Sequence, residues 1–85
     1  MNVVFHRTFE KQLRKLPRKI QNQFLVRLGF FVENARHPLL HIHTLSGVHY
    51  PLQSMNVNAD YRALFIIESD RVVFYEIGTH SALYA

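Results

Sequence analysis

Apolar residues recur at helical spacing through the first part of the chain. The first apolar stripe, which predicts an amphipathic helix over residues 9–16, consists of Phe9, Leu13 and Leu16. Pro17 ends this helix and can open the next, because a proline ring is tolerated in the first turn of a helix but not inside it. A second stripe predicts a long helix over residues 18–36 and consists of Ile20, Phe24, Leu25, Leu28, Phe31 and Val32.

The remaining pattern is typical of β-structure. Strands are predicted over residues 3–5, 50–56, 61–67 and 71–77. Turn residues at 56–60 and at Ser69-Asp70 separate the last three strands. Helices segregated from a run of hairpin-linked strands indicate an α+β fold in the order β-α-α-β-β-β. We expect one domain over residues 1–85, with a helical hairpin packed on a small, mainly antiparallel twisted sheet.

Composition narrows the class of protein. The chain has 85 residues, which allow one domain with a modest core, and it has no cysteine. The absence of cysteine excludes disulfides, a thiol nucleophile and a cysteine-type zinc site. A protein without disulfides fits the reducing cytoplasm. No apolar run approaches the ~20 residues that span a bilayer, so we expect no membrane association. The formal net charge of +4 favours a polyanion or an acidic protein as partner.

Five cations crowd around the turn between the two predicted helices. They are Lys11, Arg14, Lys15, Arg18 and Lys19, and the nearby acid is Glu10. One interpretation is a solvated helix face. The other is a phosphate-binding patch, in which each contact adds affinity that depends on salt and not on base sequence. The scarcity of neighbouring acids favours the second interpretation.

Histidines gather in the connection that precedes the sheet. His37, His41, His43 and His49 lie within one segment, and an extended backbone would place His41 and His43 on one face. Imidazoles at that spacing can hold a metal ion. No carboxylate accompanies them, however, and the spacing matches no zinc signature. We therefore expect neither a metal nor a cofactor.

Arg62 is a cation inside an otherwise apolar strand. A guanidinium stays charged in a protein, and burying it without a partner is costly. One interpretation is an ion pair with Asp60, Glu68 or Glu76. The other is that Arg62 faces a cleft that receives an anion.

His80 follows the last predicted strand, just after Gly78 breaks its extended pattern. Histidine is the side chain best suited to proton transfer near neutral pH. A fixed cation at Arg62 and an imidazole at His80, both at strand ends, are compatible with phosphate chemistry. Tyr84 is either a core aromatic residue or a side chain that stacks on a base or donates a phenolic proton.

Several short motifs together resemble the RelE/ParE superfamily of toxins from type II toxin–antitoxin systems, and within it most closely the RelE, YoeB and YafQ branches. In chain order they are Phe9-x-x-x-Leu13-x-Lys15-Leu16-Pro17, His37-Pro38-Leu39, Leu45-Ser46-Gly47, Asp60-Tyr61-Arg62-Ala63-Leu64-Phe65 and Ile77-Gly78-Thr79-His80-Ser81-Ala82-Leu83-Tyr84. Each motif is short, but their order and spacing cover nearly the whole chain.

The resemblance implies a set of catalytic residues. His43 stands where the YafQ-like branch has a histidine and the YoeB-like branch a glutamate that acts as general base. Asp60 and His80 match YafQ-like active-site residues, and Arg62 matches the arginine that RelE and YoeB use on the scissile phosphate. Tyr84 matches the aromatic residue that follows four positions after that histidine.

One position departs from the YafQ-like pattern. Asn56 stands where those toxins carry another histidine, and His49 is the candidate to take over its role.

The resemblance also implies a function. The protein would be a cytoplasmic, ribosome-dependent endoribonuclease that cleaves mRNA by attack of a ribose 2′-OH on the adjacent phosphate, without a metal. His43 or Asp60 would be the base, His80 the acid and Arg62 the charge stabiliser, while the helix cations would bind ribosomal RNA. A cognate antitoxin, encoded beside the toxin, would bind it, and the complex of the two would contact DNA through the antitoxin. The alternatives are a ParE-like gyrase inhibitor and a non-catalytic module that binds RNA or protein.

Overall fold

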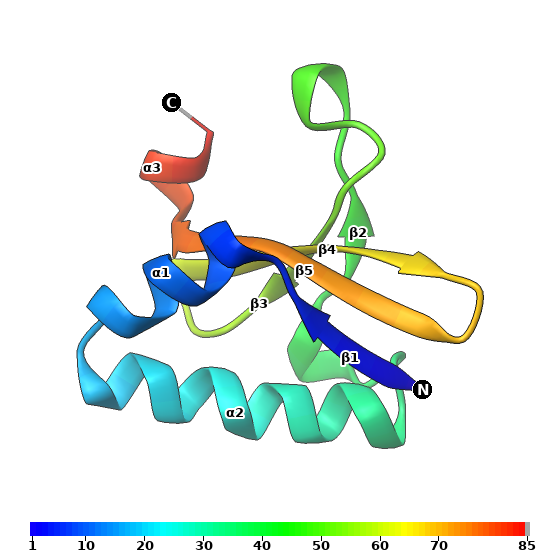
Figure 1. The fold of residues 1–85 in the computed structure, drawn as a ribbon, viewed down its shortest axis with the longest axis horizontal. Helices are drawn as coiled ribbons and strands as arrows, with labels where there is room; N and C mark the ends of the chain where they lie inside the picture. The colour runs from blue at the N-terminus through cyan, green and yellow to red at the C-terminus, as the bar shows by residue number, and fades with distance from the viewer. Residues whose placement is uncertain (85) are drawn as a thin grey trace.

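The computed structural model describes residues 1–84 and has a five-stranded sheet, with the longer helix, Arg18–Glu33, along one face and the shorter helix, Arg7–Lys15, at the edge of the sheet (Figure 1). In chain order the elements are β1 (Asn2–Phe5), α1 (Arg7–Lys15), α2 (Arg18–Glu33), β2 (His43–Thr44), β3 (Gln53–Asn56), β4 (Tyr61–Glu68), β5 (Arg71–Thr79) and α3 (His80–Leu83). Two 3-10 turns, η1 (Pro38–Leu40) and η2 (Gly47–His49), lie in the connection from α2 to β3. The predicted α+β fold with a helical hairpin on a mainly antiparallel sheet is confirmed.

The element boundaries differ from the prediction in places where local capping decides them. Helix α1 starts at Arg7, because the Nδ1 atom of His6 accepts a hydrogen bond from the Thr8 backbone N–H at 3.1 Å and caps the helix. The predicted strand over residues 50–56 is shortened to β3, because residues 50–51 form a turn directly after η2. The pattern of the sequence did not predict β2 or α3.

The strands follow the order β1-β5-β4-β3-β2 across the sheet. β1 runs parallel to β5, and the other three pairings are antiparallel. Asn56 and Gly78 are therefore the two neighbours of Arg62, one on each adjoining strand. This row of three residues lies at the end of the sheet where β5 leads into α3.

Phenylalanines form the core between the helices and the sheet. Phe9 and Phe24 of the helices are fully buried, with ring centroids 5.4 and 5.3 Å from that of Phe74 on β5. Phe31 of α2 meets Phe65 of β4 edge to face at 5.2 Å. Buried aromatic pairs at this separation stabilise a fold beyond the area they remove from water.

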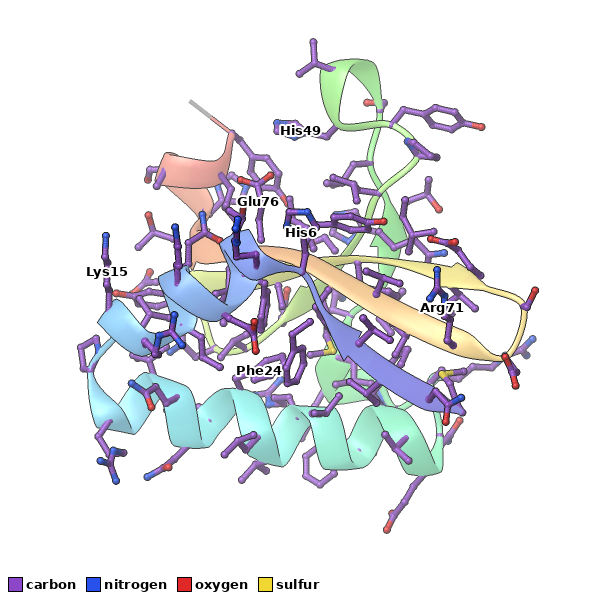
Figure 2. All side chains as sticks on the ribbon, in the orientation of Figure 1. His6, Lys15, Phe24, His49, Arg71 and Glu76 are labelled. Carbon is purple, nitrogen blue, oxygen red and sulfur yellow. The ribbon has the colours of Figure 1, made fainter. Side chains whose placement is uncertain are left out.

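The face of the sheet turned away from α2, here called the open face, carries the candidate residue Arg62 beside the buried apolar Leu64. Alternation along β4 sends Ala63 into the core and leaves Arg62 on the open face. The connection that carries η2 rises on the same side as α3 (Figure 1). Figure 2 shows His49 on this side, whereas Phe24 lies between the sheet and α2.

The helices of residues 1–84 include none with both the length and the apolar character required to cross a membrane.

Candidate active site

Arg62 is held on the open face by neutral acceptors. Its Nη1 atom donates to the backbone carbonyl oxygens of Asn58, Ala59 and Tyr61 at 2.8, 3.0 and 3.0 Å. Within residues 1–84 the only ion pair joins Arg71 to Glu68, at 3.5 Å. The ion pair considered for Arg62 is therefore not formed, and the half-buried guanidinium keeps a positive charge that no carboxylate neutralises.

His80 is the first residue of α3 and is positioned by two backbone contacts. Its N–H donates to the carbonyl oxygen of Asp60 at 2.8 Å. Thr79, just before it, caps the helix, because its hydroxyl oxygen accepts a hydrogen bond from the Ala82 N–H at 3.1 Å. The imidazole is exposed, so a substrate can reach it.

Tyr84 lies one turn after His80 and is fixed at both ends. Its ring meets the His80 ring edge to face, with centroids 4.5 Å apart. Its hydroxyl donates to the hydroxyl oxygen of Ser54, a fully buried residue of β3, at 3.2 Å. The ring is half-buried, and an aromatic ring held by such contacts can serve as a platform for base stacking.

Two adjoining depressions bring the predicted catalytic residues together. The smaller, of about 300 Å³, is lined by His41, His43, Asn56, Arg62, His80 and Tyr84. The larger, of about 660 Å³, is lined by Ala59, Asp60, Tyr61, Arg62, Thr79, His80 and Ser81. Arg62 and His80 line both and form the boundary between them. His43 and Asp60 therefore approach this pair from different sides.

The secondary candidates have different positions. Asn56 lines the smaller depression, where its side chain can contact a ligand. His49 lines neither depression and instead packs against the Tyr84 ring, with centroids 5.3 Å apart. This ring contact helps to hold the Tyr84 side chain in place.

His41 also belongs to the smaller depression, although the sequence suggested only a metal-binding role for it. Its backbone has a left-handed conformation, with φ of 48°. Its carbonyl oxygen lies 3.1 Å from Nδ1 of His43 and orients that ring. Among residues 1–84, no three histidine or acidic side chains lie close enough to share a metal ion. The sequence feature that could have placed His41 at the site is its spacing of two residues from His43, which puts both side chains on one face of an extended backbone.

The five cations of the helix turn are exposed, and they lie outside both depressions. The turn between α1 and α2 lies at the same end of the molecule as α3 in Figure 1. Lys19 lines a groove on α2 that also includes Val57, the residue after Asn56. The cations can therefore contact a polyanion that extends beyond the site.

Comparisons with known proteins agree with this architecture. The chain belongs to the ParE toxin family of type II toxin–antitoxin systems, parDE, whose family model matches residues 3–84. It is therefore a toxin of the RelE/ParE superfamily, as its motifs predicted. No curated protein matches the chain.

Solved structures of toxins share the fold. YafQ from E. coli strain BL21(DE3) has a TM-score of 0.84 at 15% identity, covering 99% of this chain and 98% of YafQ. The YoeB/ParE toxin from Agrobacterium tumefaciens has a TM-score of 0.78 at 12% identity, covering 94% and 99%. A RelB–RelE antitoxin–toxin complex from Methanococcus jannaschii matches with a TM-score of 0.72 at 19% identity, covering 95% and 94%. At these identities the likeness concerns the fold, and the activity has to be argued from the site.

Proposed function

We propose that this toxin cleaves mRNA on the ribosome, with the scissile phosphate bound between Arg62 and His80. The observation that carries the proposal is the un-neutralised guanidinium of Arg62, which lines both depressions together with an exposed imidazole. A cation of this kind stabilises the charge that develops on a phosphate during transfer. The alternative role of Arg62, an ion pair with Asp60, Glu68 or Glu76, is not formed within residues 1–84.

The proposed reaction uses groups of this chain. The ribose 2′-oxygen forms a bond to the adjacent phosphorus while the bond from phosphorus to the 5′-oxygen breaks. A base takes the 2′-OH proton and His80 gives a proton to the leaving 5′-oxygen. The products are a 2′,3′-cyclic phosphate and a 5′-OH end.

His43 is the base that the geometry favours. It shares the smaller depression with Arg62, His80 and Tyr84, so one nucleotide can contact all four side chains. Asp60 lines only the larger depression, where its carboxylate would repel the phosphate. In the proposal Tyr84 stacks on a base beside the scissile bond, and Asp60 has a secondary role.

The ribosome supplies positioning. Acid and base catalysis contribute about 10²–10⁴-fold each, and holding the reacting atoms in line contributes more. The open site has few groups that could bend RNA into that geometry unaided. The exposed cations Lys11, Arg14, Lys15, Arg18 and Lys19 would hold the toxin on ribosomal RNA.

A cognate antitoxin completes the proposal. The E. coli YafQ fold is also known from a DinJ–YafQ toxin–antitoxin complex, at 18% identity to this chain and a TM-score of 0.76. The net charge of +4 favours an acidic antitoxin segment that covers Arg62. DNA would be contacted through the antitoxin, and the toxin would act in the cytoplasm.

The second candidate function is inhibition of DNA gyrase, and the match to the ParE family model favours it. Such inhibition is binding and requires no acid–base pair. The test is to induce the toxin and measure translation and DNA damage separately. Arrested translation with intact DNA supports the nuclease, whereas DNA breaks with continued translation support gyrase inhibition.

A further inference from the structure

Asn58 organises the turn that joins β3 to β4. Its side-chain oxygen Oδ1 accepts hydrogen bonds from the backbone N–H groups of Asp60 and Tyr61, both at 2.8 Å. Its side-chain nitrogen Nδ2 donates to Oε1 of Gln23 on α2, at 2.7 Å. Its own carbonyl oxygen is one of the acceptors of the Arg62 guanidinium. One residue therefore connects α2, the turn and the candidate catalytic cation.

The contact with Gln23 is the long-range link of this network. Gln23 and Asn58 lie 35 positions apart in sequence, and both side chains are half-buried. The turn is bonded to α3 through the Asp60 carbonyl oxygen, which accepts from the His80 N–H, and the contact with Gln23 adds an attachment to α2. The residue after Gln23 in that helix, Phe24, is fully buried in the core.

A second side chain of α2 reaches the same region. Arg27 lies four residues after Gln23 on the same helix face, and its Nη1 atom donates to the carbonyl oxygens of Leu39 and Asn56. Asn56 is the neighbour of Arg62 on β3. α2 therefore holds the wall of the site at two adjacent points.

The turn in its place determines where Arg62 points. Within residues 1–84, only Nη1 of this guanidinium makes hydrogen bonds, to the carbonyl oxygens of Asn58, Ala59 and Tyr61. Nε and Nη2 remain to bind a phosphate as a planar fork. A displacement of the carbonyls by one ångström would tilt that fork, and errors of this size can cost about 10²-fold in rate.

We propose that Gln23 and Asn58 are positioning residues, whose hydrogen bond orients Arg62 for the scissile phosphate. This inference rests on the proposed nuclease function for its kinetic consequence, but not for its structural one. Neither side chain has to touch RNA. Their effect on cleavage passes through Arg62.

Isosteric substitutions test the bond without altering the packing. In Gln23→Glu the carboxylate still accepts from the Asn58 amide, and in Asn58→Asp the Gln23 amide can rotate and donate instead. The double variant Gln23→Glu/Asn58→Asp places two carboxylates face to face with no donor between them. We expect both single variants to cleave ribosome-bound mRNA within about threefold of the wild-type rate. The double variant should lose about 10–100-fold in kcat with little change in KM.

A matched control adds the same two charges but keeps the bond. Asn22 is the exposed neighbour of Gln23 and makes no side-chain hydrogen bond within residues 1–84. The variant Asn22→Asp/Asn58→Asp should therefore behave like Asn58→Asp alone. Adding the Gln23→Glu/Asn58→Asp pair to Arg62→Ala should cause no further loss. A similar loss in the matched control, or an additive loss on top of Arg62→Ala, would overturn the inference.

Nuclear magnetic resonance of the arginine side chains gives a readout that does not depend on activity. Hydrogen bonds from Nη1 slow rotation of the guanidinium, so the Nη1 and Nη2 signals of Arg62 should be separate in the wild type and averaged in the double variant. Averaged signals in the wild type would overturn the positioning role whatever the activity. Separate wild-type signals that average in the double variant, in a protein without nuclease activity, would keep the positioning role and reject only the proposed function.

Discussion

The backbone N–H of His80 donates to the carbonyl oxygen of Asp60 at 2.8 Å, and this bond joins the first turn of α3 to the start of β4. Arg62 follows Asp60 by two residues, so the same bond sets the imidazole beside the guanidinium. The two residues line both depressions of the open face. Backbone geometry, not a direct side-chain contact, brings the candidate acid and the candidate cation together.

Arg62 should be irreplaceable for cleavage. Arg62→Ala removes the charge, and Arg62→Lys keeps the charge but loses the planar fork that binds two phosphate oxygens. We expect cleavage to fall by about 10³-fold or more in the first variant and by about 10–100-fold in the second. Rate measurements on purified ribosome–mRNA complexes test this, with sedimentation as the control that both variants still bind ribosomes. Wild-type cleavage by Arg62→Ala would reject the assignment.

The proton-transfer roles can be separated by neutral substitutions of similar shape. His43→Gln and His80→Gln should each reduce kcat by about 10²–10⁴-fold, because each removes one acid or base. Asp60→Asn should cost less than about tenfold, since its backbone carbonyl, which holds His80, is retained. Single-turnover rates at saturating ribosome concentration distinguish the two candidates for the base. A large loss in Asp60→Asn with a small one in His43→Gln would exchange their roles.

Tyr84 should act through its ring more than through its hydroxyl. Tyr84→Phe keeps the stacking surface but leaves the buried Ser54 hydroxyl without its partner. Tyr84→Ala removes the platform, and stacking is worth about 1–3 kcal/mol per base. We therefore expect KM to rise by about 5–150-fold in Tyr84→Ala and less than about threefold in Tyr84→Phe. Equal losses in both variants would indicate that the hydroxyl, not the ring, contacts the substrate.

The helix cations should govern attachment to the ribosome and not the chemical step. Lys15→Gln and Arg18→Gln should each reduce the salt dependence of ribosome binding by about one unit of log K per log salt concentration. Arg71→Gln is a matched control, because Arg71 is an exposed arginine at the opposite end of the molecule from Lys15 (Figure 2). Binding titrations at several salt concentrations test this. An equal effect of all three variants would show general charge attraction without a defined patch.

Much of the fold could be predicted from the sequence, because apolar spacing is a local signal. The 3.6-residue periodicity of α2 and the continuous apolar runs of β4 and β5 were sufficient to assign all three elements. β2 was not predicted, because its two residues, His43 and Thr44, are both exposed and give no apolar alternation. α3 was not predicted, because a helix of one turn is too short to show a periodic pattern of apolar residues. The parallel pairing of β1 with β5 links the two ends of the chain and leaves no local pattern.

The candidate site was predictable to a smaller extent. The sequence left Arg62 between an ion pair and a cleft that receives an anion, and the family motifs named His43, Asp60, His80 and Tyr84 as candidates. The roles of Gln23 and Asn58 could not be predicted, because their contact joins positions 35 residues apart and neither residue type is unusual where it stands. Asn58 was recognisable as a turn residue, but its partner appears only when the helix packs beside the turn.

Sequencing the 5′ ends of cellular mRNA after induction shows whether the toxin cleaves mRNA and whether Arg62 is required. We expect new 5′-OH ends within translated reading frames in cells that express the wild-type toxin, and none with Arg62→Ala at equal expression. Growth arrest without new 5′-OH ends, or the same ends with Arg62→Ala, would contradict this expectation.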